Sequence, residues 1–574
     1  MTVSKKPSRA VYIFFFLSGM TALTYEIIWT RMLTLVFGHT VFSVSVVLAA
    51  FMAGLGFGSY LWGHVIDRIS GGQAGDAPGK SSPIMIYAVI EILIFATSAL
   101  LSLVFSEFDM FYAWFHKWLP ESPGLFNLIK AMLAFLLMFI PTTLMGATLP
   151  IISKYYVTDN SRLGSQVGIL YGLNTLGAVV GCLLTGFVFI SLFGVLQTAL
   201  LTSLVNLVIG IGCIRIYQED EQGKIRTFRF PKLSLPPRRW NREQKLWMSV
   251  SFICGFTALA YEVLWTRLLV FSISSTVYSF SMMLAVFLFG IALGSFGVIP
   301  LIRKYQNLRT VLICLQAGAG IYVLFSLFAM EYILSPPWNS YNLQNPMAVF
   351  LRYARDASAL MLVPSILLGM NFPILIRIVS GGYEHVGRGT GQIYASNTLG
   401  AILGSLLAGF VFLPLLKSES SLISIASLNL LAALFLFLTG DYSTPVLRKG
   451  VAAAFAGALV LVNVTLPRDL LQPFFMRDSV GQRDIKKLLF FEEGLTATVA
   501  VFKDNYGILD PEAKRLVTNG ISMSASNYIA TRYMKLFAHV PILLSDNPEN
   551  VLVICYGTGQ TTGAAGIHPR VKSV

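Results

Sequence analysis

The stretch Gly19–Arg31, which reads GMTALTYEIIWTR, returns in the second half of the chain at Gly255–Arg267 as GFTALAYEVLWTR, with an offset in numbering of 236. A second block, YGLNTLG at Tyr171–Gly177, returns as YASNTLG at Tyr394–Gly400, with an offset of 223. Two long matches in the same order indicate a duplicated unit. Both copies are strongly apolar, and duplicated apolar bundles are a common plan of membrane transporters.

The composition indicates whether the chain is soluble or lies in a membrane. Its 574 residues are 55% hydrophobic and only 12% charged, with a mean hydropathy of +0.69. Soluble domains carry about 25% charged residues. The chain is therefore predicted to be a multi-pass membrane protein whose main partner is the lipid bilayer.

Apolar runs long enough to cross a bilayer number six in each half of the chain. The predicted domains are a first six-helix repeat at 1–215, a basic cytoplasmic loop at 216–247 and a second six-helix repeat at 248–440. This layout, with a G-x-x-x-D-R sequence at Gly63–Arg68, resembles the major facilitator superfamily. The predicted spans lie near 11–33, 41–63, 84–105, 127–153, 165–190, 194–215, 248–270, 277–300, 309–330, 351–378, 388–413 and 421–439.

The net charge of +14 comes from basic residues that cluster between the apolar runs. This is the positive-inside pattern of membrane proteins, and no nucleic-acid-binding module accompanies it. We therefore predict no nucleic-acid partner. The five cysteines form no C-x-x-C pair, so we predict neither a metal site nor a disulfide.

Two alternatives exist for 449–466. It is either a thirteenth membrane helix, which would place the rest of the chain outside the cytoplasm, or an interfacial helix, which would leave it inside. Charges return after it, and alternating residues such as those of 494–502 predict a small β region that opens a separate domain at 476–574.

Polar residues inside the predicted spans are the first site candidates, because an ionised carboxylate in hydrocarbon costs at least ~2.5 kcal/mol. Glu26 and Glu262 occupy equivalent positions of the repeated motif, each five residues before an arginine, Arg31 or Arg267. One hypothesis is a structural ion pair or hydrogen bond that fixes the packing of the repeats. The other is a relay for protons or cations through the bundle.

Three further residues are candidates. Asn174 and Asn397 lie in glycine-rich helices, where an amide either joins two closely packed helices or contacts a substrate. Glu91 has no carboxylate twin, because Gln316 falls near the equivalent position. A substrate site requires asymmetry of this kind.

The chain from Phe491 onward resembles the spermidine synthases, which are polyamine aminopropyltransferases. The resemblance rests on Tyr533-x-x-Leu-Phe-Ala-His539-Val-Pro, on the Asn547-Pro548 pair and on an apolar strand at 551–554 followed by Gly557-Thr558-Gly559. With its duplicated bundle, the whole chain resembles bacterial fused facilitator/spermidine-synthase membrane proteins. The resemblance implies the bacterial inner (plasma) membrane.

For the carboxyl-terminal region the resemblance implies a small β domain that leads into a Rossmann-like fold. That fold would bind a nucleotide like decarboxylated S-adenosylmethionine at Gly557, Thr558 and Gly559, with Tyr533 and His539 near the substrate. Thr558 replaces the aspartate of the family's glycine loop, and the catalytic and ribose-binding acids would lie beyond Val574. We therefore expect the domain to be incomplete, with no catalytic residue and no certain cofactor in this chain.

Two hypotheses follow from these residues. The first is a member of the spermidine-synthase family tethered to the membrane, linked to polyamine or S-adenosylmethionine-type metabolism. The second is a transporter of a small solute, such as a cation, whose appended domain is vestigial or regulatory. The residues do not settle the oligomeric state.

Overall fold

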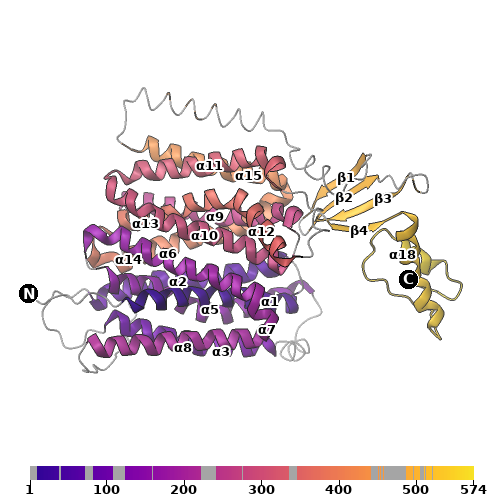
Figure 1. Cartoon of the computed structure of the whole chain (residues 1–574), viewed down its shortest axis with the longest axis horizontal. Helices are drawn as coiled ribbons and strands as arrows, with labels where there is room; N and C mark the ends of the chain where they lie inside the picture. The colour runs from indigo at the N-terminus through magenta and orange to yellow at the C-terminus, as the bar shows by residue number, and fades with distance from the viewer. Residues whose placement is uncertain are drawn as a thin grey trace, which may run out of the picture.

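The computed structural model describes a long helical bundle followed by a small sheet region (Figure 1). The described residues are 9–37, 41–70, 82–107, 123–157, 159–220, 241–273, 276–334, 345–440, 450, 453, 455, 457, 487–494, 497–503, 510, 512–519 and 521–574. Most of the predicted thirteenth helix at 449–466 and most of the predicted basic loop at 216–247 lie outside them.

The bundle contains two sets of helices, one from each repeat. The first set is α1 (Ala10–Phe37), α2 (Val41–Ser70), α3 (Pro83–Ser106), α5 (Pro123–Tyr156), α6 (Leu163–Leu184) with its continuation α7 (Ile190–Phe193), and α8 (Val195–Asp220). The second set is α9 (Arg242–Ile273), α10 (Val277–Lys304), α11 (Leu308–Ile333), α12 (Pro346–Ala357) continued by α13 (Val363–Ser380), α14 (Val386–Leu407) and α15 (Leu413–Leu438).

The two sets pack in the same way. In the first repeat α1 packs on α6, α2 on α5 and α3 on α8; in the second, α9 packs on α14, α10 on α13 and α11 on α15. The repeats join through two equivalent contacts, α2 on α14 and α10 on α6. The fold is therefore a polytopic bundle of two six-helix repeats, as the repeated sequence predicts.

Among the described residues, ten helical segments are long and apolar enough to cross a membrane. The segment Val386–Leu438 counts as one of them, although 53 residues of helix would measure about 80 Å, far more than a bilayer of about 30 Å. The backbone leaves helical geometry at Lys417, near the start of α15, where φ is 62°, so the segment contains two spans, one on each side of this residue. This gives eleven spans, and the remaining predicted span, at 41–63, lies in α2, which is not among the ten segments. Each of the twelve predicted spans therefore coincides with helical residues of the bundle.

A departure from α-helical geometry also occurs at equivalent positions of the two repeats. A π-helical turn at Thr185–Phe189 follows α6, and another at Ala408–Phe412 follows α14. The two turns are related by the same offset as the repeated YxxNTLG block. Turns of this type are rare and often mark functional positions in helices.

The sheet region has four antiparallel strands in the order of the chain: β1 (Lys487–Glu493), β2 (Thr498–Lys503), β3 (Lys514–Thr518) and β4 (Ile521–Ala525). Burial alternates along β2, which confirms the strand that alternation predicts at 494–502. Helices α18 (Tyr528–Leu544) and α19 (Gln560–Gly566) follow.

The structure corrects the prediction of a strand at the apolar run 551–554. It is not a buried strand, because Leu552 is 84% and Ile554 80% exposed. Among the described residues, the only pairing beside it is a single parallel bridge from Asn550 to Ser573. One bridge does not supply the neighbouring strands that would cover these side chains.

The sheet lies at one end of the bundle, which we call the sheet end (Figure 1). β1 contacts α15, Glu493 accepts a hydrogen bond from the Ser418 hydroxyl (2.5 Å), and Arg267 donates to the Gly494 carbonyl (2.7 Å). Arg68, Lys154, Arg215, Arg303 and Arg309 lie near the other helix termini, at what we call the basic end.

Candidate functional site

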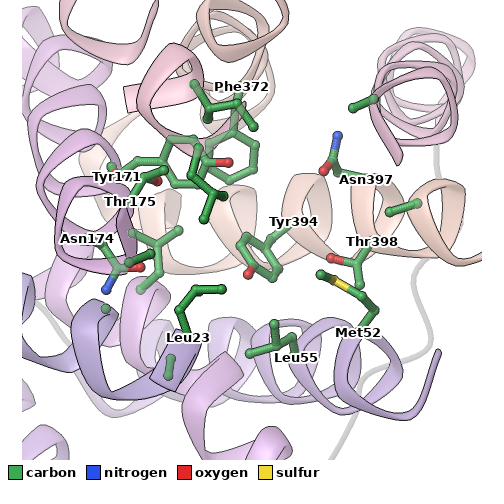
Figure 2. A pocket seen from close by; sticks show the side chains of 18 of the residues that line it. Leu23, Met52, Leu55, Tyr171, Asn174, Thr175, Phe372, Tyr394, Asn397 and Thr398 are labelled. Carbon is green, nitrogen blue, oxygen red and sulfur yellow. Dashed lines mark hydrogen bonds between the residues drawn. The ribbon is translucent and has the colours of Figure 1, made fainter. Parts of the chain in front are cut away.

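A cavity of about 200 Å³ lies between the two repeats. Four helices of each repeat line it: α1, α2, α5 and α6 from the first, and α9, α10, α13 and α14 from the second. Figure 2 shows Asn174 and Asn397 on opposite sides of this space. One water needs roughly 10–15 Å³ of such space, so the cavity has room for several waters or for a small solute.

The lining of this cavity repeats the symmetry of the sequence. Glu26 and Glu262, Phe51 and Phe287, and the other lining residues of α1, α2, α9 and α10 are related by the first offset, 236. Lining residues of α5, α6, α13 and α14 are related by the second offset, 223. Within the lining, only Gly19 and Leu375 lack a partner at these offsets. The cavity therefore lies on the axis that relates the repeats.

Glu26 and Glu262 are the only charged side chains in the lining, and both are half-buried. They come from different repeats and line the same cavity. Within the described part of the chain, neither carboxylate has a hydrogen-bond donor or a basic partner. The structure brings together two residues that lie far apart in the sequence, and it leaves their charges uncompensated.

The arginines of the repeated motif lie elsewhere. Arg31 is exposed. Arg267 points to the sheet, where its Nη2 donates to the Gly494 carbonyl (2.7 Å) and lies 3.3 Å from the Thr498 hydroxyl. Neither guanidinium neutralises the glutamate that precedes it by five residues.

The tyrosine and tryptophan of the motif explain why the glutamate faces the cavity. Tyr25 stacks on Trp29 with ring centroids 5.0 Å apart, and Tyr261 stacks on Trp265 at the same distance. All four rings are buried within their own repeats. With the aromatic face of each helix turned inward, the intervening glutamate lines the cavity between the repeats.

Of the two roles that the sequence left open for the asparagines, the structure shows the contact between helices, and the contact with a substrate stays a prediction. The Asn174 amide nitrogen donates to the Phe15 carbonyl of α1 (3.1 Å), and that of Asn397 donates to the Ser251 carbonyl of α9 (3.2 Å). Both residues also line the cavity. The amide nitrogens join helices, which leaves the amide oxygens as acceptors toward the cavity.

Glu91 lies outside the cavity lining, buried between α1, α3 and α8. It accepts hydrogen bonds from the Ser18 hydroxyl (2.7 Å) and from the Asn206 amide (2.7 Å). The Tyr25 hydroxyl donates in turn to the Asn206 amide oxygen (3.1 Å). We call Ser18, Tyr25, Glu91 and Asn206 the Glu91 network.

The second repeat contains the same arrangement with an amide in place of the acid. The Asn429 amide donates to Gln316 Oε1 (2.6 Å), and Gln316 Nε2 donates to Cys254 Sγ (3.1 Å). The Tyr261 hydroxyl donates to the Asn429 amide oxygen (2.8 Å). Sequence reasoning missed Asn206 and Asn429, although they are related by the offset of the YxxNTLG block, and this signal identifies them.

The Gly63–Arg68 motif lies at the basic end, where it joins helices of the two repeats. Asp67 accepts hydrogen bonds from the backbone N–H groups of Gly387 (3.2 Å) and Arg388 (2.6 Å), at the amino terminus of α14. It also forms an ion pair with Lys154 (3.0 Å). A carboxylate at a helix amino terminus is stabilised by the helix dipole, so this contact holds α2 against α14.

A second hollow, of about 690 Å³, lies in the carboxyl-terminal region. Its lining includes Tyr533, Gly557 and Thr558, but neither His539 nor Gly559. The Thr558 hydroxyl forms a hydrogen bond with the Ser524 hydroxyl (2.9 Å). Among the described residues, no group of three His, Cys, Asp or Glu side chains could hold a metal ion.

A comparison with known protein families finds none that matches the chain. One curated relative is a polyamine aminopropyltransferase of Oceanobacillus iheyensis, 22% identical over 338 residues. The match covers 58% of this chain and 60% of the relative. The aligned stretch of 338 residues is far longer than the predicted domain at 476–574, so most of the aligned residues lie before that domain.

Two of the solved structures that match the chain are of a membrane transporter and of a homologue of one. The human organic anion transporter MFSD10 matches with a TM-score of 0.44 and 13% identity, over 75% of this chain and all of that protein. A bacterial homologue of the iron transporter ferroportin, in its outward-facing state, matches with a TM-score of 0.46 and 13% identity, over 74% of this chain and 98% of that protein.

Proposed function

We propose that this protein is a transporter of a small organic cation and that the cavity between the repeats is its binding site. The observation that carries the proposal is the pair Glu26 and Glu262: two carboxylates in one cavity, without a basic partner among the described residues. Carboxylates inside the hydrocarbon region are costly, and they normally face a partner or a water-filled path. A cation bound between them offsets the cost for both.

The rest of the lining suits a cation. Tyr171, Tyr394 and Phe372 contribute aromatic rings, whose faces attract cations. The amide oxygens of Asn174 and Asn397 are hydrogen-bond acceptors, as an ammonium group requires. No basic side chain lines the cavity to repel the substrate.

The pairing of the carboxylates favours a dication. A diamine presents one ammonium group to each carboxylate, whereas a monoamine leaves one of the two charges uncompensated. The name of the curated relative, a polyamine aminopropyltransferase, points to the same class of compound. We therefore propose linear diamines, with putrescine as the probe.

The two-repeat architecture supplies a mechanism for movement. In transporters built from repeats, one repeat rocks against the other around a site near the middle of the membrane. The Asp67 contact with Gly387, Arg388 and Lys154 holds the basic end closed. Breaking that contact would open the cavity toward the basic end.

The orientation of the bundle in the membrane favours transport over the other hypothesis, an aminopropyl transfer that takes place in the cytoplasm. Cytoplasmic loops carry an excess of Lys and Arg, which assigns the basic end to the cytoplasm. The sheet is attached to the other end, through Arg267 and Ser418. The second hollow then lies outside the cytoplasm, away from cytoplasmic nucleotides.

Cys555 tests this orientation without any engineered residue, because it is exposed in the carboxyl-terminal region. We expect a membrane-impermeant maleimide to label wild-type protein in intact spheroplasts as fully as in lysed ones. Cys555→Ser should lose this labelling, which excludes Cys314, the other exposed cysteine. Labelling of Cys555 only after lysis would place the sheet in the cytoplasm.

A second candidate function is aminopropyl transfer at the hollow that Gly557 and Thr558 line. The name of the curated relative favours it. We expect no spermidine when the purified chain is given decarboxylated S-adenosylmethionine and putrescine, because Thr558 stands where the resemblance requires an aspartate. Spermidine formed by wild-type protein but not by Thr558→Pro would establish this function instead.

The direct test of transport is uptake of radiolabelled putrescine into proteoliposomes that contain the purified protein. We expect saturable uptake that other linear diamines inhibit and that an organic anion of similar size does not. Uptake no greater than in protein-free liposomes, at every pH gradient applied, would refute the proposal.

A further inference from the structure

The Glu91 network and its counterpart around Gln316 form a natural comparison within one chain. Tyr25 and Asn206 have the same roles in the first repeat as Tyr261 and Asn429 have in the second. The two networks differ at the central position, which is an acid in one repeat and an amide in the other. Glutamate and glutamine have almost the same shape, so the second repeat demonstrates that packing does not require the acid.

A carboxyl group at this position adds one property that an amide lacks, because it can gain and lose a proton. Burying it is costly, since an ionised carboxylate without water depends entirely on its hydrogen bonds. Ser18 and Asn206 provide two such bonds, one to each oxygen of Glu91. The site therefore stabilises a charged state that the fold alone does not need.

The surroundings of Glu91 contain no competing charge. Tyr25 of α1, Tyr87 of α3 and Cys213 of α8 are the titratable groups that face it. Among the described residues, no Lys, Arg, His or second carboxylate contacts it. A proton is thus the cation available to neutralise Glu91.

Ser18 connects this position to the central cavity. Its side chain lines the cavity and donates to Glu91 Oε1 at 2.7 Å. In the second repeat, Cys254 lines the cavity at the equivalent position, but there Gln316 Nε2 donates the hydrogen bond and Cys254 Sγ accepts it. A single hydroxyl therefore separates Glu91 from a space with room for water.

We propose that Glu91 is a proton-binding site that exchanges with the central cavity through Ser18, and that Gln316 is its permanently neutral counterpart. In each exchange the Ser18 hydroxyl passes its proton to Glu91 and takes one from a hydronium ion in the cavity, which becomes water. One proton is bound in total, and no other bond changes. Only the first repeat carries the proton.

The proposal rests on the proposed transport function and defines its energy source. A cation in the cavity is stabilised by a negative charge at Glu91, and it loses that stabilisation when Glu91 is protonated. Cation binding and proton release are therefore coupled, and by linkage each changes the equilibrium of the other. We infer exchange of a proton for an organic cation.

The test compares two kinds of flux in proteoliposomes with radiolabelled putrescine as the probe. In wild-type protein, an acidic interior should drive accumulation of putrescine, and putrescine should also exchange for putrescine when no pH gradient exists. Glu91→Gln should lose the accumulation and keep the exchange. Glu91→Asp, which retains a carboxyl group, should restore part of the accumulation.

The variant Glu91→Gln is a sound test because Gln316 already occupies the equivalent environment in a folded repeat. A purely structural role for Glu91 would lower both kinds of flux together. Equal accumulation by wild-type protein and Glu91→Gln would overturn the proposal, as would the loss of both fluxes in a variant that elutes as folded protein.

Infrared spectroscopy separates failure of this site from failure of the transport proposal. The protonated carboxyl of Glu91 should contribute a C=O band that appears as the pH is lowered and that Glu91→Gln lacks. If putrescine is not transported but this band is found, the proton site stands and the transported solute is wrong. If no such band is found at any pH in wild-type protein, the proton site is refuted.

Discussion

Glu26→Gln and Glu262→Gln are each expected to weaken the uptake of putrescine strongly. Each change removes one of the two charges in the cavity while keeping the size of the side chain. A hydrogen bond to a charged group contributes about 1.5–3 kcal/mol, so each substitution should weaken binding roughly ten- to hundredfold. The measurement is the concentration of putrescine that gives half-maximal uptake in proteoliposomes.

The two single variants should differ from wild-type protein in selectivity as well as in affinity. A monoamine such as butylamine needs only one carboxylate. In the two variants, butylamine should therefore lose less of its ability to inhibit putrescine uptake than a diamine loses. Glu107→Gln is the matched control, because Glu107 follows the last residue of α3, is exposed and lies outside the cavity lining. If all three variants transported putrescine as wild-type protein does, the cavity would not be the binding site.

Gly255→Leu is expected to prevent the second repeat from folding. A Cβ atom at Gly255 would overlap the Asn397 carbonyl of α14, and the equivalent Gly19 meets the Asn174 carbonyl of α6 in the same way. Overpacking by even small groups typically costs about 1–3 kcal/mol, and here a backbone atom rather than a flexible side chain is in the way. We expect aggregation on size-exclusion chromatography, or a midpoint of thermal unfolding far below that of wild-type protein.

Gly318→Ala is the control for this effect. Gly318 lies in α11 of the same repeat, and a Cβ atom there would approach only Leu367 Cδ1, at 3.4 Å. We expect its thermal midpoint to stay close to that of wild-type protein. If Gly255→Leu also behaved like wild-type protein, the close approach of α9 and α14 would be wrong.

The repeat made the fold predictable. Two sequence offsets, 236 and 223, identify a duplicated bundle, and the same offsets relate the helix pairs and the residues that line the cavity. The sequence also selected Glu26 and Glu262 as unusual. It did not indicate that they share one cavity, because this depends on which face of each helix turns toward the other repeat.

Other features depend on contacts that no local pattern records. The partners of Glu91 come from α1 and α8, 73 and 115 residues away along the chain. Similarly, the run at 551–554 has the composition of a buried strand, but burial requires neighbouring strands that composition does not reveal.

Equilibrium binding of radiolabelled putrescine to the purified protein in detergent shows directly whether the cavity between the repeats is a binding site. Binding avoids the questions of orientation and driving force that affect uptake. We expect saturable binding by wild-type protein and Glu107→Gln, and strongly weakened binding by Glu26→Gln and Glu262→Gln. Equal binding by all four proteins would mean that Glu26 and Glu262 do not form the binding site.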